Sequence, residues 1–295
     1  MKPNMRGVGI ALITPFSEDG SVDFGALEAL VERVTAGGAD YLVVLGTTAE
    51  TPTLTADEKE AVVSCVVRKN NGPLPVVLGM GGNNTAEVVA SIRKTDFTGI
   101  DAILTVTPYY NKPSQEGIYQ HYKAVAAAAP CGVVLYNVPG RTGVNMKAET
   151  VLRLAHDCPN VVAVKEASGC LSQAAYILRD RPEGFAVVSG DDNLTLPMVA
   201  LGGDGIISVA AQAFPEKFCR MAHLALDGRV KEAASLHLQM MEAVDSLFEE
   251  GNPTGIKAAL SCLGVIGNYL RLPLVPASDR LVSKIDGLLK AYELR

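Results

Sequence analysis

The sequence contains no tryptophan and only 5% aromatic residues, and no two of its six cysteines have Cys-x-x-Cys spacing. The cysteines stand mostly in apolar stretches, which is typical of buried, reduced thiols in a cytoplasmic protein. The four histidines, at positions 121, 156, 223 and 237, show no metal-ligand spacing among themselves. We therefore expect a cytoplasmic protein with neither a disulfide framework nor a metal site.

Runs of basic residues are absent as well, and the formal net charge is −6. This argues against a nucleic-acid partner, whose phosphates require a cationic surface. The longest apolar region, Ala124 to Tyr136, contains Pro130 and Gly132 and is too short to span a bilayer. The apolar stretch Gly7 to Ile13 lacks a small-x-small cleavage site, so we interpret it as a buried strand rather than a signal peptide.

What the sequence does contain is a repeating pattern of an apolar run, a turn and a segment with helical periodicity. The runs are rich in Val, Ile and Leu without polar alternation, which is typical of strands buried on both faces of a parallel sheet. The eight runs are Gly7–Thr14, Tyr41–Leu45, Leu74–Gly79, Asp101–Val106, Gly132–Tyr136, Val161–Val164, Phe185–Ser189 and Gly205–Val209. Between them, Thr55 and Glu58 form a capping box that predicts a helix start.

Eight such units favour a closed (β/α)₈ TIM barrel over an open doubly wound sheet. The rival Rossmann-like sheet lacks its phosphate fingerprint, because Asn84 stands where the last glycine of Gly-x-Gly-x-x-Gly belongs. The strand pattern stops near residue 226, and helices are expected over 231–248, 255–263 and 279–292. We predict a catalytic barrel over residues 1–225 and a C-terminal helical region over 226–295.

Two reactive side chains end apolar runs, where catalytic groups of a TIM barrel are found. Lys165 directly follows Val161–Val164, and burial favours the neutral amine that Schiff-base catalysis needs. The alternative for Lys165 is an ion pair with Glu166 or an amine that reaches out to solvent. Tyr136 is suited to proton transfer, although from the local sequence a half-buried core tyrosine with a bonded hydroxyl is the more ordinary interpretation.

Three loops after the runs carry further polar groups. The segment Gly46–Glu50, Gly-Thr-Thr-Ala-Glu, offers backbone N–H groups and hydroxyls to a carboxylate. Tyr109 and Tyr110 follow the fourth run, and Arg141, whose guanidinium fits a carboxylate, follows the fifth. Each loop also has an ordinary structural interpretation. Together they predict an amine, phenols, an anion nest and a carboxylate clamp on one rim.

Over essentially its whole length the chain resembles the dihydrodipicolinate synthase / N-acetylneuraminate lyase family of class I pyruvate aldolases. The stretches that carry the resemblance are Ala11–Phe16, Thr107–Gln115, Tyr136–Gly143, Val164–Ser168, Ser189–Asp192 and Arg271–Leu274. Arg141 favours the synthase branch, because the sialic-acid lyases usually lack it. The resemblance implies condensation of pyruvate with L-aspartate 4-semialdehyde, in diaminopimelate and lysine biosynthesis, without a metal or redox cofactor.

The resemblance also implies a role for each site residue. Lys165 would form the Schiff base with pyruvate, and Tyr136 would be the acid/base. Thr48, Tyr136 and Tyr110 would form a proton relay, with Tyr110 from a neighbouring subunit. Thr47 and Thr48 would bind the pyruvate carboxylate, and Arg141 would bind the second substrate. Gly190 and Ile207 would line the pocket. A homo-oligomer, a dimer of dimers, is expected.

Two departures from the family pattern concern the loop and a regulatory site. Ala49 replaces a glycine of the usual Gly-Thr-Thr-Gly-Glu loop, where a left-handed backbone would be awkward for alanine. Many members bind L-lysine as an inhibitor at positions that match Thr51, Ala56, Lys59, Asn83, Glu87 and Tyr109. Lys59 would repel the effector's amines, so we expect weak or absent inhibition.

Two other functions remain open on the sequence. One is a related class I pyruvate aldolase that acts on a sugar acid or sialic acid, for which Arg141 is the feature at issue. The other is a non-catalytic barrel that binds a keto acid as a sensor or carrier. Such a protein would have no need for Lys165 together with Tyr136 and Thr48.

Overall fold

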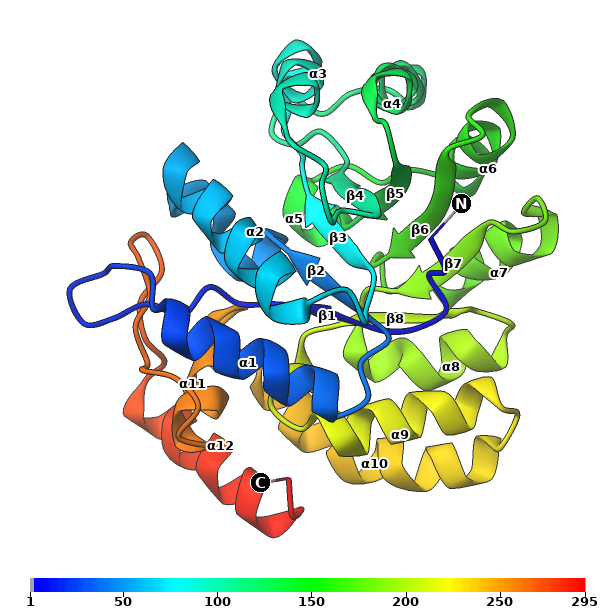
Figure 1. Ribbon diagram of the computed structural model, residues 1–295. Coiled ribbons are helices and arrows are strands. Elements are labelled where there is room, and N and C mark those ends of the chain that lie inside the picture. Colours follow the sequence, from blue (N-terminus) through cyan, green and yellow to red (C-terminus); the bar gives the residue numbers. More distant parts are fainter. Residues whose placement is uncertain (1–2, 295) are drawn as a thin grey trace.

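The computed structural model describes residues 3–294 and forms a closed barrel of eight parallel strands (Figure 1). The strands pair in chain order, and β1 closes the ring against β8 with Gly7 opposite Gly205. They are β1 Gly7–Ala11, β2 Tyr41–Val44, β3 Val76–Gly79, β4 Ala102–Val106, β5 Gly132–Asn137, β6 Val161–Glu166, β7 Ala186–Ser189 and β8 Gly205–Ser208. The predicted TIM barrel is confirmed.

The strands are buried almost throughout, which is why they read as unbroken apolar runs. Close packing inside the ring also requires small residues at particular places. A Cβ atom on Gly9 of β1 would lie 2.1 Å from the ring of Tyr41, its partner on β2. Glycine at position 9 therefore makes room for the fully buried tyrosine.

Helices follow the strands and cover the outside of the barrel (Figure 1). They are α1 Phe24–Ala36, α2 Ala56–Asn70, α3 Thr85–Lys94, α4 Gln115–Ala128, α5 Pro139–Thr142, α6 Ala148–Asp157, α7 Leu171–Asp180, α8 Thr195–Ala200 and α9 Pro215–Leu226. The capping box predicted at the start of α2 is present. Thr55 Oγ1 accepts from the Glu58 N–H, and the Glu58 carboxylate accepts from the Thr55 N–H.

Three further helices follow α9, close to the ranges expected from the sequence: α10 Val230–Ser246, α11 Thr254–Cys262 and α12 Asp279–Ala291. Helix α10 packs along α9 at the lower edge of Figure 1, and α11 packs against α12. Their buried faces join the same hydrophobic core as the strands, through side chains such as Leu247, Ile256 and Leu281. Within residues 3–294, no helix has the length and apolar character needed to cross a membrane.

Candidate active site

Lys165 and Tyr136 lie side by side at the ends of two neighbouring strands. They face each other in register across β6 and β5, and both side chains are buried. Lys165 Nζ lies 4.5 Å from the centre of the Tyr136 ring. The structure therefore brings together the amine and the phenol that the sequence singled out separately.

The carboxylate of Glu166 is occupied by neutral donors rather than by Lys165. Successive side chains of a strand point to opposite faces of the sheet, so Lys165 and Glu166 point apart. Glu166 accepts from Asn137 Nδ2 at 3.1 Å, from Gln173 Nε2 at 2.9 Å and from the Ser168 N–H at 2.8 Å. These hydrogen bonds explain why the Glu166 carboxylate can be buried without an ion pair to Lys165.

Gly190 lies directly against the lysine. A Cβ atom at this position would stand 3.0 Å from Lys165 Cε and 2.4 Å from Ala167 Cβ. The Gly190 N–H donates to the main-chain oxygen of Glu166 at 2.8 Å, which holds the loop after β7 close to the end of β6. Ile207, the other expected lining residue, is fully buried in β8.

Two carboxyl groups that sequence reasoning left without a role lie near the lysine. Asp192 is buried and accepts from Ser208 Oγ at 2.5 Å and from the Val209 N–H at 3.3 Å. Burial raises the pKa of Asp192 to about 6, and it also raises the pKa of Asp191. The charge of Lys165 acts on both groups in the opposite direction, by favouring their ionised forms. The sequence marks these two acids only as part of Ser189–Asp192, a stretch that carries the family resemblance but assigns neither of them a role.

The loop after β2 is a short 3₁₀ turn over Thr47–Ala49. Thr48 is buried and Thr47 is exposed, so the two hydroxyls have different surroundings. Ala49 does not adopt the left-handed backbone that would be awkward for alanine; the next residue, Glu50, adopts it, with φ 55°. Ala49 sits inside the turn, and its main-chain oxygen accepts from Thr14 Oγ1 at 2.8 Å. The alanine is therefore compatible with this loop.

Asn252, in the segment between α10 and α11, connects two of the expected site residues. Its Nδ2 donates to Thr48 Oγ1 at 3.0 Å, and its main-chain oxygen accepts from Arg141 Nη2 at 3.3 Å. Arg141 is exposed and follows β5 on the short helix α5. The sequence gave no local signal for Asn252, because its partners lie 204 and 111 residues earlier in the chain.

The two tyrosines after β4 lie on the surface. Tyr110 is 83% exposed and adopts a left-handed backbone with φ 72°, and Tyr109 is 42% exposed. Asn83 Nδ2 donates to the main-chain oxygen of Tyr109 at 3.2 Å, which brings together two residues of the expected lysine site. The other expected members are Thr51, which donates to Gly46 O, Lys59 on α2, which is partly buried, and Glu87 on α3, which is exposed. The roles of all these residues remain predictions.

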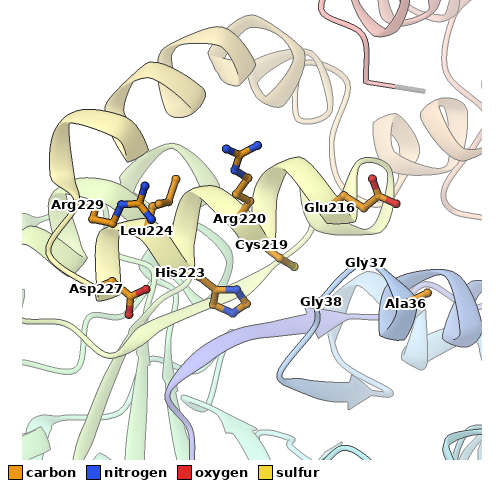
Figure 2. A pocket seen from close by; sticks show the side chains of 10 residues that line it. All are labelled: Ala36, Gly37, Gly38, Glu216, Cys219, Arg220, His223, Leu224, Asp227 and Arg229. Carbon is orange, nitrogen blue, oxygen red and sulfur yellow. The ribbon is translucent and has the colours of Figure 1, made fainter.

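A hollow of about 410 Å³ lies away from this site, between the C-terminal end of α1 and helix α9 (Figure 2). Its lining includes Gly38, Arg220 and His223. His223 Nε2 lies 2.7 Å from Asp40 Oδ2, and Asp40 directly precedes β2. The hollow is thus near the beginning of a strand, whereas Lys165 stands at the end of one. Within residues 3–294, no cluster of His, Cys, Asp or Glu side chains is arranged to hold a metal ion.

The buried amine and the tyrosine lie at the carboxyl ends of strands in a closed parallel barrel, which is where enzymes with this fold carry their active sites. Comparisons with known proteins identify the class of enzyme. Residues 4–292 of the chain match the model of the family described as "Dihydrodipicolinate synthetase family". The chain belongs to this family, and thus to the lyase-type enzymes of the pyruvate-dependent aldolase class.

Individual relatives are similar over their whole length. The 4-hydroxy-tetrahydrodipicolinate synthase of Parabacteroides distasonis is 54% identical over 99% of this chain and 98% of its own. Two solved dihydrodipicolinate synthases share the fold. One, from Cyanidioschyzon merolae with lysine bound, is 41% identical with a TM-score of 0.95 and full coverage of both chains. The other, from Acinetobacter baumannii with pyruvate, is 37% identical with a TM-score of 0.95 and covers 99% of this chain and 100% of its own.

Proposed function

We propose that this protein condenses pyruvate with L-aspartate 4-semialdehyde to give 4-hydroxy-tetrahydrodipicolinate, through an imine on Lys165. The observation that carries the proposal is the buried Lys165 amine 4.5 Å from the Tyr136 ring at the strand ends. The P. distasonis relative bears the name of this synthase activity. The product belongs to diaminopimelate and lysine biosynthesis, and we place the reaction in the cytoplasm, where buried thiols such as Cys65 and Cys219 stay reduced.

The chemistry begins with attack of Lys165 Nζ on the keto carbon of pyruvate, followed by loss of water. The resulting protonated imine withdraws electrons, so that a methyl proton of the bound pyruvate can be removed. The enamine carbon then forms a bond to the aldehyde carbon of the second substrate. The amino group of the adduct displaces Lys165 Nζ and closes the ring. Because the imine itself is the electron sink, the proposed reaction needs no metal or redox cofactor.

Tyr136 is proposed as the acid/base, since its ring lies against the amine that must gain and lose protons. Thr48 and Tyr110 would extend a proton relay from it. Thr47 and Thr48 would bind the pyruvate carboxylate, and Arg141 would bind the carboxylate of the second substrate. Arg141 suits this role because its guanidinium is exposed at the same end of the barrel.

We further propose that a second copy of the chain completes the site. Tyr110 is 83% exposed, so its ring is available to a neighbouring molecule. Its backbone is left-handed, which is uncommon for a non-glycine residue and distinguishes this position in the loop after β4. A dimer that exchanges these tyrosines, and a tetramer made of two such dimers, is the proposed assembly.

The imine is tested by intact mass after incubation with pyruvate and borohydride. We expect an increase equal to pyruvic acid less one oxygen atom, absent in Lys165→Ala. Lys94→Ala, which changes an exposed lysine at the end of α3, is the matched control and should label like the wild type. No increase in the wild-type protein would overturn the proposed function.

The alternative within the same class is an aldolase for a sugar acid or sialic acid. It would give the same borohydride adduct, so the acceptor must be tested separately. Arg141 distinguishes the two, because it provides a site for the carboxylate of an amino-acid aldehyde. Turnover with L-aspartate 4-semialdehyde that falls sharply in Arg141→Ala would support the synthase, and turnover only with sugar aldehydes would support the alternative.

A further inference from the structure

The two strands that carry the amine and the phenol change register part-way along their length. Val133 of β5 lies opposite Val161 of β6, whereas the next residue, Val134, lies opposite Ala163. Val162 is left without a partner, so β6 contains a β-bulge. The main-chain pairing of these strands therefore accommodates two registers, one on either side of the bulge.

The register beyond the bulge decides which residue of β6 faces Tyr136. In the structure this residue is Lys165. If the register before the bulge continued, Val164 would stand there instead. A shift of one residue also moves every side chain of a strand to the other face of the sheet, so the lysine would point away from the barrel interior. The contact between amine and phenol thus requires that the second register be held.

Asn137 and Glu166, which directly follow Tyr136 and Lys165, form a pair in this second register. Asn137 Nδ2 lies 3.1 Å from each carboxylate oxygen of Glu166, and both side chains are buried. Because side chains alternate along a strand, this pair lies on the opposite face of the sheet from the amine and the phenol. In the first register Asn137 would lie opposite Lys165, and the hydrogen bond would be lost.

Further hydrogen bonds hold both members of the pair. Asn137 Oδ1 accepts from the Met146 N–H at 2.9 Å, and Asn137 Nδ2 also donates to Asn145 Oδ1 at 2.8 Å. Gln173 Nε2, on α7, donates to the Glu166 carboxylate at 2.9 Å. Every polar atom of the two side chains is therefore bonded. A fully bonded network in a buried place specifies one arrangement of the groups around it.

The polar character of the pair indicates that it does not serve stability alone. Two apolar side chains would fill the same space without the cost of burying a carboxylate. Apolar contacts have no direction, however, and tolerate a shift of register, whereas a buried polar pair specifies one register. The pair of Asn137 and Glu166 therefore fits a requirement for register better than a requirement for stability.

We propose that Asn137 and Glu166 are positioning residues that hold the ends of β5 and β6 in the register in which the Lys165 amine lies against the Tyr136 ring. This inference rests on the proposed function, because it takes the amine and the phenol to act together in imine formation. It predicts that breaking the pair slows imine formation at each site without reducing the number of sites that can form the imine.

The experiment follows imine formation with pyruvate by adding borohydride at successive times and measuring the labelled fraction by intact mass. The rate reports the position of the reacting groups, and the final labelled fraction reports how much of the protein is competent. Asn137→Asp sets two acceptors against each other, and Glu166→Gln sets two donors against each other. We expect each to lower the maximal rate on the order of 100-fold, as for a misplacement of about 1 Å. The final fraction and the half-saturating pyruvate concentration should not change.

The double variant, Asn137→Asp with Glu166→Gln, reverses the direction of the hydrogen bond, because the new amide can donate to the new carboxylate. It should form the imine about tenfold faster than either single variant, as expected for side chains coupled in one network. Asn160→Ala is the matched control at the beginning of β6. It removes a hydrogen bond from Nδ2 to the main-chain oxygen of Ala126, 2.9 Å long, and its rate should equal that of the wild type.

A double variant no faster than the single variants would overturn the inference. Single variants in which only the final labelled fraction falls would also overturn it, because that result indicates loss of folded protein rather than loss of position. If Asn137→Asp does not fold, Asn137→Ser takes its place, since it is too short to reach Glu166 and adds no charge. A wild-type rate in Asn137→Ser would equally overturn the inference.

The wild-type protein separates this inference from the proposed function. If it never becomes labelled, both are overturned. If it becomes labelled and the single variants form the imine at the same rate, only the positioning role of Asn137 and Glu166 is overturned. Full labelling of the single variants at a much lower rate, with partial recovery in the double variant, is the expected result.

Discussion

Lys257 Nζ lies 2.5 Å from Glu50 Oε1 in a place where neither side chain reaches solvent. The ammonium also donates to the Tyr269 main-chain oxygen at 2.9 Å and lies 4.1 Å from the centre of the Phe16 ring. Burial lowers the pKa of Lys257 to about 8, while Glu50 opposes that shift. The pair joins the C-terminal region to the loop that carries Thr48.

Removal of one partner of this pair should destabilise the protein strongly. Lys257→Met leaves the Glu50 carboxylate buried without its cation, so we expect a loss of about 3–5 kcal/mol in the free energy of unfolding. The double variant Lys257→Met with Glu50→Gln removes both charges and should recover a large part of it. Urea unfolding of the three proteins checks this, and a double variant no more stable than Lys257→Met would contradict it.

Gly190→Ala should slow imine formation by displacing the segments that meet at Lys165. The added methyl group would stand 2.4 Å from Ala167 Cβ, which cannot rotate away, and 3.0 Å from Lys165 Cε, so the main chain there and the lysine side chain must both shift. We expect the borohydride trapping rate to fall on the order of 100-fold, as for a misplacement of about 1 Å. Gly287→Ala, in α12 with open space around the new methyl group, is the control. Equal trapping by both variants would show that Gly190 does not confine the lysine.

The His223–Asp40 contact beside the hollow of Figure 2 should make stability depend on pH. The hydrogen bond to Asp40 raises the pKa of His223 above its usual 6.5. A raised pKa stabilises the fold most when the group is protonated, so this contribution is complete below about pH 6.5 and is lost as pH rises through the raised value. The melting temperature of His223→Gln should therefore fall below that of wild type by more at pH 5.5 than at pH 9.

His156→Gln is the control for this measurement, because His156 is exposed on α6. Its melting temperature should follow that of the wild-type protein at both pH values. A His223→Gln deficit that is the same at pH 5.5 and pH 9 would show that the contact acts through packing rather than through charge.

L-lysine at millimolar concentration should leave the activity unchanged. Lys59 lies partly buried on α2 and, if lysine bound at the expected site, would place a positive charge near the amines of the effector. Lys59→His removes most of that charge above pH 7 and should increase the inhibition. Steady-state rates with and without lysine decide this, and strong inhibition of the wild-type protein would refute it.

The barrel could be predicted because its signals are local. Each strand is an apolar run, and the start of α2 is indicated by the capping box of Thr55 and Glu58, which are three positions apart. Lys165 could be found for the same reason, since a lysine that ends an apolar run stands out from its neighbours. Its partner Tyr136 ends the preceding run, and strand pairing in chain order places the two together.

The contacts of the C-terminal region could not be predicted from local signals. Asn252 meets Thr48 across 204 residues of sequence, and nothing in the pattern around either one points to the other. Lys257 does have a local signal, because it is a lone charge in the apolar segment Ile256–Leu260, just as Lys165 follows the apolar run Val161–Val164. The burial of its partner Glu50 could not be predicted, because Glu50 stands in a polar loop that is typical of an exposed surface. Such pairs become visible only once the fold brings the segments together.

The contacts that Asn252 and Lys257 make with the loop after β2 can form only late in the synthesis of the protein. A ribosome releases the loop with Thr48 and Glu50 early, but the two side chains that hold it are made more than 200 residues later. A nascent chain that has already produced all eight strands still lacks them. The loop that carries Thr48 and Glu50 therefore gains these two contacts only after translation has passed residue 257, and a prematurely terminated product would lack them.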